Sequence, residues 1–337
     1  MKKNIFVLCD LEALYTSRLM EYICEKQERG FEVQGFTSVE KLCAFAKEQK
    51  INLLLISSQA MCEEIKELSI GQIMLLSEGE MGEEEVAEYP ILYKYQSAET
   101  LLAEVMRFYA EETSVSPKIF RNKDVEILGV YSPIGEPQKS SFALTLGQIL
   151  SKERKVLYIS LESYAGFEGL MEEELQSDLS ELMYFAKQEN GNLVYKLNGM
   201  VHHIGSLDYI PPSFSPQDIR SVLLEEWRYL WEQIRLYTTY NTVIIEFGEQ
   251  PQALYDLLNE CDCIYMPIRE DAISIARLGQ YEQVLSVEGY EAVLGKTKKL
   301  NLPTQEAVVY EKDYLNKLLW GEMGAFVRTL ICEGKEG

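Results

Sequence analysis

Apolar residues follow two different spacings along the first 112 residues. Five short apolar runs predict strands: Asn4–Cys9, Phe31–Phe36, Ile51–Ser57, Ile73–Leu76 and Ile91–Tyr93. Three stretches with apolar residues every three or four positions predict helices: Leu14–Lys26, Val39–Lys47 and Ala98–Tyr109. Continuous apolar strands separated by helices are typical of a parallel sheet that is covered on both faces. Residues 1–112 are therefore predicted to form a doubly wound α/β domain.

Residues 113–124 are polar, contain Pro117 and a small basic cluster, and are predicted to be a linker. A second α/β domain is predicted over residues 125–337. Its predicted strands are Val125–Tyr131, Lys155–Ser160, Leu193–Lys196, His203–Leu207, Tyr240–Glu246, Cys261–Pro267 and Lys296–Leu302. Its predicted helices are Phe142–Leu150, Asp178–Glu189, Pro216–Tyr237 and Tyr314–Ile331.

The stretch after the first of these strands has the layout of a phosphate-binding loop. A loop with Pro133, Gly135 and Pro137 leads into Lys139-Ser140-Ser141, which opens a helix. In such a loop, backbone N–H groups hold the phosphates, the lysine reaches the outer phosphates and the hydroxyl binds Mg²⁺. The strict pattern would place glycines at 133 and 138, where this chain has Pro133 and Gln138.

The segment SPIGEPQKSS, residues 132–141, resembles the loop S-P-K-G-G-V-G-K-T-T of the MinD/ParA family of P-loop ATPases without a gap. This resemblance implies a P-loop NTPase domain with a mostly parallel sheet and bound ATP and Mg²⁺. The residues that would bind the nucleotide are Gly135, Lys139, Ser140 and Ser141.

The loop departs from that family at several positions. The signature lysine, which in the family reaches the nucleotide of a dimer partner, is replaced by Ile134, and two glycines are replaced by Glu136 and Gln138. Pro137 has no N–H to offer a phosphate. A carboxylate at Glu136 would repel a polyphosphate unless neighbouring groups screen it.

Two carboxylates match catalytic positions of the same family. The family's D-x-D after the second strand corresponds to Ser160 and Glu162, and its Walker B aspartate corresponds to Glu246 in YNTVIIEFG, residues 240–248. Glu162 and Glu246 are the candidate catalytic residues, and Ser140 with Glu246 would bind Mg²⁺. In the family, the stretch after Cys261–Pro267 begins a helix that contacts the dimer partner.

Residues 1–112 resemble the flavodoxin-like receiver domain of response regulators. The positions of its pocket correspond to Asp10, Ser57, Ser77 and Lys94, with Ser57 where the family has the phosphate-accepting aspartate. Two interpretations stay open: a vestigial pocket in which Lys94 pairs with Asp10, or unrelated polar residues at strand ends. Both exclude phosphoryl transfer to an aspartate and favour a role in protein contact.

Composition narrows the functional classes further. A net charge of −22 argues against nonspecific nucleic-acid binding. No apolar run reaches the length of a membrane span, and the N-terminus lacks a signal-peptide hydrophobic region. The seven cysteines include no C-x-x-C pair and, with only two histidines, indicate neither a disulfide framework nor a zinc site. A cytoplasmic location is expected.

A receiver-like domain joined to a MinD-like domain is similar to the TadZ/CpaE proteins, which localise Tad pilus and related secretion machinery to a cell pole. The resemblance implies a homodimer, pilus or secretion assembly proteins as partners, and membrane association through them. The altered motifs favour a pseudo-ATPase. An active ATPase with a non-standard P-loop is the alternative, and a plain α/β scaffold with a coincidental loop is a third.

Overall fold

The computed structural model describes residues 4–26, 31–78, 89–112, 125–172, 175, 177–188, 193–303 and 314–336. The chain divides into two compact units. Unit 1 comprises Met1–Ile119 and Glu189–Met200, and unit 2 comprises Phe120–Gln188 and Val201–Gly337. The predicted linker at 113–124, with its basic residues, lies outside the described residues.

Unit 1 is built on a parallel sheet whose described strands have the order β2-β1-β3-β4-β5. The strands are β1 (Asn4–Cys9), β2 (Phe31–Phe36), β3 (Leu53–Ser57), β4 (Gln72–Ser77) and β5 (Ile91–Tyr93). The helices are α1 (Ala13–Lys26), α2 (Val39–Glu48), α3 (Glu63–Lys66) and α4 (Ala98–Glu112), with a short 3₁₀ turn at Ser58–Ala60. This order is compatible with the predicted flavodoxin-like arrangement.

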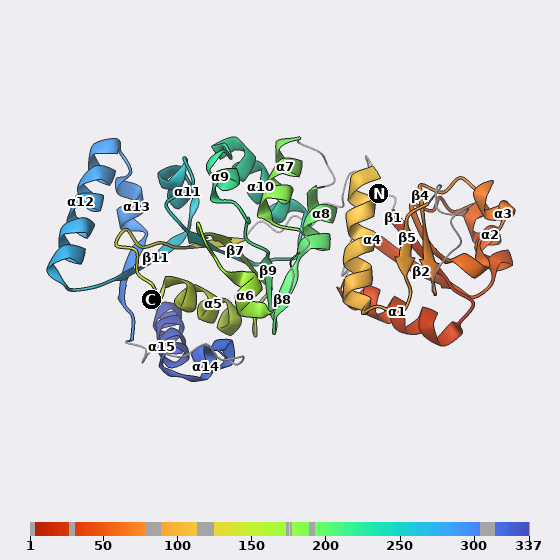
Figure 1. Cartoon of the computed structure of the whole chain (residues 1–337), viewed down its shortest axis with the longest axis horizontal. Helices are drawn as coiled ribbons and strands as arrows, with labels where there is room; N and C mark the ends of the chain where they lie inside the picture. Colours follow the sequence, from red (N-terminus) through yellow and green to blue (C-terminus); the bar gives the residue numbers. More distant parts are fainter. Residues whose placement is uncertain are drawn as a thin grey trace. The chain divides into compact units, whose positions relative to one another are not determined.

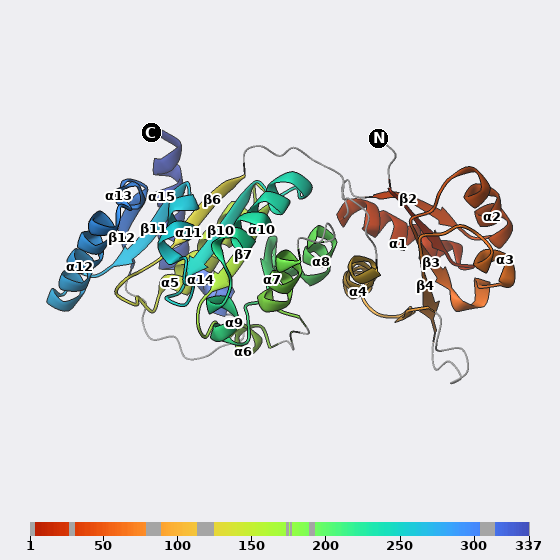
Figure 2. The ribbon, with the colours of Figure 1, turned by 90° about the horizontal axis from the view of Figure 1, so that it is seen from above.

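The two faces of this sheet carry separate apolar cores. Phe6 and Leu8 of β1 pack toward α1 and α4, whereas Val7 and Cys9 pack toward α2 and α3. Figure 2 shows these helix pairs on opposite faces of the sheet. Because both faces are buried, the strands are continuously apolar instead of alternating, which is why their positions could be predicted.

Unit 1 also includes a helix from the middle of the chain, α8 (Leu193–Met200). The prediction of a strand at Leu193–Lys196 is wrong. Tyr195 packs edge-on against Tyr109 at 5.0 Å between ring centroids, and its hydroxyl accepts a hydrogen bond from Asn4 at 3.1 Å. At Gly199, a Cβ would lie 2.9 Å from the Ala103 carbonyl oxygen, so only glycine allows this close approach to α4.

Unit 2 contains a mostly parallel sheet with the described strand order β12-β11-β6-β10-β7-β9-β8. The strands are β6 (Glu126–Val130), β7 (Val156–Leu161), β8 (His202–Ile204), β9 (Leu207–Ile210), β10 (Thr242–Phe247), β11 (Cys263–Ile268) and β12 (Thr297–Asn301). Only the β8–β9 pair is antiparallel among these. The predicted strand His203–Leu207 is confirmed only in part: it covers the end of β8 and the first residue of β9, but the hairpin turn interrupts it at Gly205, which has a φ of +63°. The predicted α/β class with parallel sheets is confirmed.

Helices cover both faces of this sheet, with α5, α14 and α15 on one face and α10 and α11 on the other (Figure 1). The helices of unit 2 are α5 (Lys139–Leu150), α6 (Phe167–Met171), α7 (Leu179–Lys187), α9 (Pro216–Arg220), α10 (Leu224–Tyr237), α11 (Leu254–Glu260), α12 (Ala272–Glu288), α13 (Glu291–Gly295), α14 (Tyr314–Trp320) and α15 (Glu322–Glu336). No helix in the described ranges is long and apolar enough to cross a membrane.

Two long predicted helices are each divided in the structure. The stretch Pro216–Tyr237 breaks into α9 and α10 around Leu223, whose backbone N–H donates to the Glu226 carboxylate at 2.8 Å. The stretch Tyr314–Ile331 breaks into α14 and α15 beside Gly321. A Cβ at Gly321 would lie 2.7 Å from the Lys317 carbonyl oxygen, so the tight turn requires glycine. Apolar periodicity continues across both breaks and does not reveal them.

Candidate functional site

The candidate residues of unit 2 meet because three neighbouring parallel strands end at the same edge of the sheet. Glu246 of β10 is in register with Val130 of β6 on one side and with Ser160 of β7 on the other. The loop at 131–138 follows β6, and Glu162 follows β7 by one residue. In open α/β sheets, this carboxyl edge is where ligands bind. The structure therefore places the loop and both candidate carboxylates together.

The loop itself is folded as two consecutive turns before α5 begins at Lys139. The Gly135 N–H donates to the Ser132 carbonyl at 3.2 Å, and the Lys139 N–H donates to the Glu136 carbonyl at 3.1 Å. Gly135 has a φ of +70°, in the left-handed region where glycine carries no steric penalty. The Ser132 hydroxyl donates to the Pro267 carbonyl at 2.8 Å and fastens the loop to β11.

Glu136 turns its carboxylate into this loop and is 7% exposed. Its Oε1 accepts the backbone N–H of Gln138 at 3.3 Å and a guanidinium N–H of Arg269 at 3.0 Å, while Oε2 accepts from Nε of Arg269. The carboxylate thus bonds a loop N–H of the kind that would hold a phosphate. The neighbour that screens Glu136 is Arg269, which the resemblance to known ATPases did not suggest.

The side chain of Lys139 is also fully engaged. Its ammonium forms an ion pair with the carboxylate of Glu162 and donates to the backbone carbonyl of Phe247. Lys139 is buried, at 8% exposed. The lysine that would contact outer phosphates is therefore held by a carboxylate and by the end of β10.

Glu246 lies at the centre of a hydrogen-bond cluster. The Ser140 hydroxyl donates to its Oε1 at 2.6 Å, and the hydroxyls of Tyr158 and Ser160 donate to its Oε2, the latter at 3.4 Å. Burial raises the pKa of Glu246 above that of an ordinary carboxyl group, even though Lys139 and the hydrogen bonds from Ser140 and Tyr158 oppose this shift. Burial likewise raises the pKa of Tyr158, and the nearby Glu246 carboxyl adds to that shift.

The two expected magnesium ligands, Ser140 and Glu246, are hydrogen-bonded to each other in this structure. Mg²⁺ is usually bound through one or two carboxylates together with waters and phosphate oxygens. Both oxygens of Glu246 accept hydrogen bonds from hydroxyl groups, and burial favours its protonated form. Among the described residues, no group of three or more His, Cys, Asp or Glu side chains could hold a metal ion.

Ser141 and Ile134 have contacts of other kinds in this structure. The Ser141 hydroxyl is paired with the Tyr314 hydroxyl at 2.7 Å, on the side of α5 that faces α14. Ile134 is buried, and its backbone carbonyl accepts from Arg277 at 3.4 Å. Of the four predicted nucleotide-binding residues, Gly135, Lys139 and Ser140 lie at the loop, whereas Ser141 is directed to another partner.

The sequence analysis missed Arg269 and Tyr158. Tyr158 was detectable in principle, because residues two apart on a strand share one face, and Ser160 was already assigned to the site.

Asp262, which matches a position of the MinD/ParA strand, has a structural task instead. It fastens β11 to β6 by accepting the Ile127 N–H on its carboxylate at 2.7 Å.

In unit 1 the predicted pocket residues are only partly brought together. The ammonium of Lys94 lies 3.0 Å from Asp10, 2.8 Å from Glu12 and 2.8 Å from Glu78. Although burial lowers the pKa of Lys94, hydrogen bonds to Glu12, Glu78 and Asp10 outweigh it and raise the pKa overall. Lys94 and Asp10 do pair, as one of the two interpretations required. Glu78 was not anticipated.

The two serines of the predicted pocket lie at the ends of β3 and β4. The carbonyl of Ser77 accepts the backbone N–H of Lys94 at 2.8 Å. Ser57 accepts the Gln59 N–H at 3.3 Å and caps the short 3₁₀ turn. Ser77 is buried at the end of β4. The Lys94 ammonium is thus paired with three carboxylates. It is not available for a switch that needs an unpaired lysine.

Several solved structures are similar in fold to this chain. The ParA family ATPase from Chlorobium tepidum TLS aligns at 18% identity and a TM-score of 0.43, over 60% of this chain and 92% of its own. A putative plasmid partition protein from Borrelia burgdorferi B31 bound to AMPPNP aligns at 15% identity and a TM-score of 0.45, over 62% and 99%. McdA from Cyanothece in complex with ATP aligns at 15% identity and a TM-score of 0.42, over 58% and 77%.

No model of a protein family matches the sequence, and no curated protein sequence matches it either. At identities below 20%, the structural matches concern the fold alone. The functional argument therefore rests on the geometry of the two sites described above.

Proposed function

We propose that this chain is a TadZ/CpaE-like localisation or assembly factor for Tad-type pilus or secretion machinery, and that its P-loop unit is a pseudo-ATPase. Its partners would be pilus or secretion assembly proteins, which would bring it to the membrane or to a cell pole. Unit 1 would serve as a protein-contact module. The resemblance of the two-domain layout supports the assembly role, and the internal pairing of the loop supports the loss of ATPase activity.

The observation that carries the pseudo-ATPase proposal is that each group a nucleotide needs already has a partner within the chain. The loop N–H of Gln138 donates to Glu136, Lys139 bonds Glu162, and Ser140 bonds Glu246. Phosphates entering the loop would have to displace the buried carboxylate of Glu136 and separate Lys139 from Glu162. Separating these ion pairs costs free energy, although less than for fully buried pairs, because the side chains of Arg269 and Glu162 are 55% and 26% exposed. Nucleotide binding must exceed this cost before any net affinity remains.

Hydrolysis faces a second obstacle at the candidate carboxylates. A general base must be ionised and within reach of the attacking water. Burial raises the pKa of Glu246 and favours the protonated acid, and Glu162 is engaged by the Lys139 ammonium. Ser160 occupies the place of the family's first aspartate and has no charge to offer. This arrangement favours a protonated Glu246 over an ionised carboxylate that could activate water.

We include a homodimer in the proposal, held by fixed contacts instead of nucleotide. The start of α12 exposes Ile273 at 67% and Ile275 at 57%, where the resemblance to MinD/ParA proteins implies a dimer contact. Arg269, which precedes this helix, is kept in place by its bond to Glu136. The Glu136 carboxylate would then hold Arg269 in position, as a bound phosphate could in an ATPase.

The direct test of the pseudo-ATPase is phosphate release from ATP and Mg²⁺ by the purified full chain, measured beside Lys139→Ala. Equal rates of phosphate release by the parent chain and by Lys139→Ala support the proposal. Phosphate release by the parent chain that Lys139→Ala abolishes contradicts it. The assembly role is tested by fluorescence microscopy of the tagged chain in its native cells. A polar focus that persists in Lys139→Ala supports it, and uniform fluorescence of the parent chain contradicts it.

The alternative of an active ATPase keeps one supporting observation. Lys139 and Ser140 open α5 directly after a strand–loop segment, and two carboxylates lie beside them. In that case ATP would displace Glu136 and Glu162 from their present partners. Lys139-dependent phosphate release, accompanied by tight ATP binding to the parent chain, would establish this function.

A further inference from the structure

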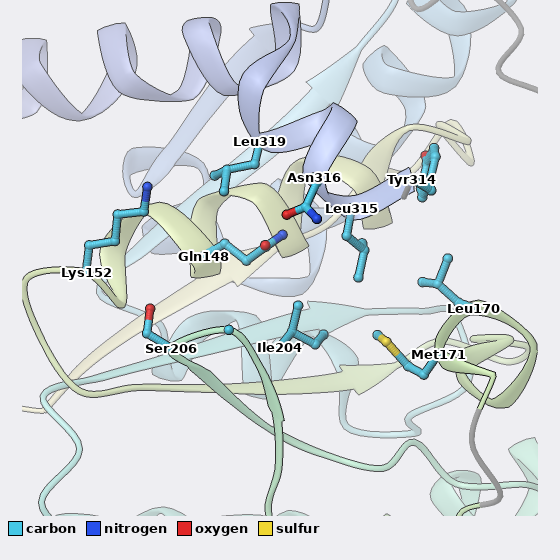
Figure 3. A pocket seen from close by; sticks show the side chains of 11 residues that line it. Gln148, Lys152, Leu170, Met171, Ile204, Ser206, Tyr314, Leu315, Asn316 and Leu319 are labelled. Atoms are coloured by element: carbon cyan, nitrogen blue, oxygen red, sulfur yellow. The ribbon is translucent and has the colours of Figure 1, made fainter. Parts of the chain in front are cut away.

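A pocket of about 350 Å³ lies at the far end of α5 from the loop (Figure 3). Its walls come from α5, α6, the turn between β8 and β9, and α14, all of which belong to unit 2. This volume falls within the range of small-molecule sites, about 300–1,000 Å³. Since a water molecule occupies about 30 Å³ in the liquid, the space accommodates on the order of a dozen non-hydrogen atoms.

The pocket contains a buried hydrogen-bond donor that lacks an acceptor among the described residues. Gln148 is 6% exposed, and its side-chain nitrogen has no hydrogen-bond partner in the described part of the chain. Figure 3 shows its amide at the pocket, between Ile204 and Asn316. Buried polar groups are nearly always hydrogen-bonded, so an unpaired amide calls for an acceptor from outside the chain.

Capping of α5 does not explain this amide. The carbonyl of Gly147 accepts the Ser151 N–H at 2.9 Å, and the carbonyl of Leu150 accepts the Arg154 N–H at 3.2 Å. The carbonyl of Gln148 itself accepts from the Ser151 hydroxyl at 3.1 Å. The end of the helix is therefore already satisfied by the turn that follows it.

The charge of the lining favours an anion. Of the chain's 337 residues, 54 are acidic, yet none of the described lining residues is. The lining does include Lys152, which lies in the turn directly after α5. Its ammonium contacts the Trp320 ring at 4.9 Å from the centroid and forms no ion pair within the described residues.

The rest of the lining favours a hydrocarbon body on the ligand. Leu170, Met171 and Ile204 face Leu315 and Leu319 across the pocket. We propose that this pocket binds a small amphipathic carboxylate. Its head group accepts hydrogen bonds from the Gln148 amide and the Lys152 ammonium, and its hydrocarbon chain packs between α6 and α14. This site is separate from the loop and does not depend on the pseudo-ATPase proposal.

The proposal is tested by isothermal titration calorimetry of the full chain with octanoate, with octanol and octylamine as matched neutral and cationic probes. We expect saturable binding of octanoate, weaker binding of octanol and none of octylamine. Lack of saturable octanoate binding would overturn the proposal, and so would equal binding of the three probes, which would indicate nonspecific apolar adsorption.

Two variants assign the contacts. Gln148→Leu keeps the side-chain size and removes only an unpaired amide, so the thermal stability should be unchanged or higher while octanoate affinity falls at least about tenfold. Lys152→Met, at an exposed position, should fold normally and lose a similar factor. Lys155→Met, outside the pocket lining, is the control and should bind as the parent does. Parent-like affinity in both Gln148→Leu and Lys152→Met would refute the proposed head-group contacts.

Discussion

Arg269 holds the carboxylate of Glu136 inside the loop before α5, with a guanidinium nitrogen 3.0 Å from Oε1, although the two residues are 133 positions apart in the chain. Glu136 in turn accepts the backbone N–H of Gln138. The Glu136 carboxylate thus bonds a backbone N–H of the loop that, under the P-loop proposal, would bind a phosphate. This relationship explains how a loop with a carboxylate at a glycine position can be stable.

The first prediction concerns the energy of this pair. Arg269→Gln leaves the buried Glu136 carboxylate without its cation, whereas Arg269→Gln combined with Glu136→Gln removes both charges. Because the Arg269 side chain is 55% exposed, we expect a coupling energy of about 1–3 kcal/mol, below the full value for a buried pair. A double-mutant cycle in urea denaturation measures it. Coupling below about 0.3 kcal/mol would show that the pair does not hold the loop.

The second prediction concerns pH and Glu246. Burial raises the pKa of Glu246 in the folded chain, so the folded state binds this proton more tightly than the unfolded state. The stability that Glu246 contributes is therefore present at pH below the ordinary carboxyl pKa and is lost as pH rises through the raised value. Glu246→Gln removes this titration. We expect the variant to gain stability relative to the parent as pH rises from acidic to neutral.

Urea denaturation of the parent and of Glu246→Gln at several pH values measures the difference between their free energies of unfolding. The contributions of all other titrating groups cancel in this difference. A relative stability that falls as pH rises would mean that Lys139 and the hydroxyls stabilise the ionised carboxylate. That result would also restore Glu246 as a candidate base.

The third prediction concerns the ion cluster of unit 1. Lys94→Met leaves Asp10 buried and unpaired, and we expect a loss of about 3 kcal/mol in unfolding free energy. Asp10→Asn in the same chain should recover a large part of it. Lys66→Met is the matched control, because Lys66 forms an exposed pair with Glu63 that is worth under about 0.5 kcal/mol. Equal effects of the two lysine substitutions would argue against a structural role for Lys94.

The fourth prediction concerns the proposed homodimer. The double substitution Ile273→Glu with Ile275→Glu should convert a dimer into a monomer, because it places two charges in an apolar contact. Val287→Glu, at the other end of α12 and 80% exposed, should leave the dimer intact. Sedimentation velocity of the three chains distinguishes them. A parent chain that is monomeric at micromolar concentration, or a Val287→Glu effect as large as that of the isoleucine pair, would remove this part of the proposal.

The sequence was sufficient to predict most of the parallel strands. Strands such as Leu53–Ser57 and Thr242–Phe247 are buried on both faces and therefore contain apolar residues at consecutive positions, at 53–56 and 243–245. The sequence was insufficient where a short apolar run fits both the spacing of a strand and the spacing of a helix. Leu193–Lys196 has apolar residues at consecutive positions and forms a helix that packs on α4 of unit 1. Tertiary contact decides such segments, and local pattern does not show it.

The candidate site divides in the same way. The positions of Lys139, Ser140 and Glu246 followed from a loop and a strand that each can be recognised locally. The ion pairs of the site did not follow, although Glu162 was already a candidate residue. Glu162 bonds Lys139 and Arg269 bonds Glu136 from the ends of other strands, whose meeting depends on strand order. Tyr158 lies between these cases, since its place two residues before Ser160 already assigned it to the same face of β7.

The most direct test of the central claim is a thermal-unfolding titration of the full chain with ATP and Mg²⁺, beside Glu136→Gly and Lys139→Ala. A ligand at a hundredfold excess over its Kd stabilises the folded state by about 2.7 kcal/mol. We predict no shift in melting temperature for the parent chain at millimolar ATP. A clear rise in the parent that disappears in Lys139→Ala would contradict the account, because it would mean that nucleotide displaces the Glu136 and Glu162 carboxylates.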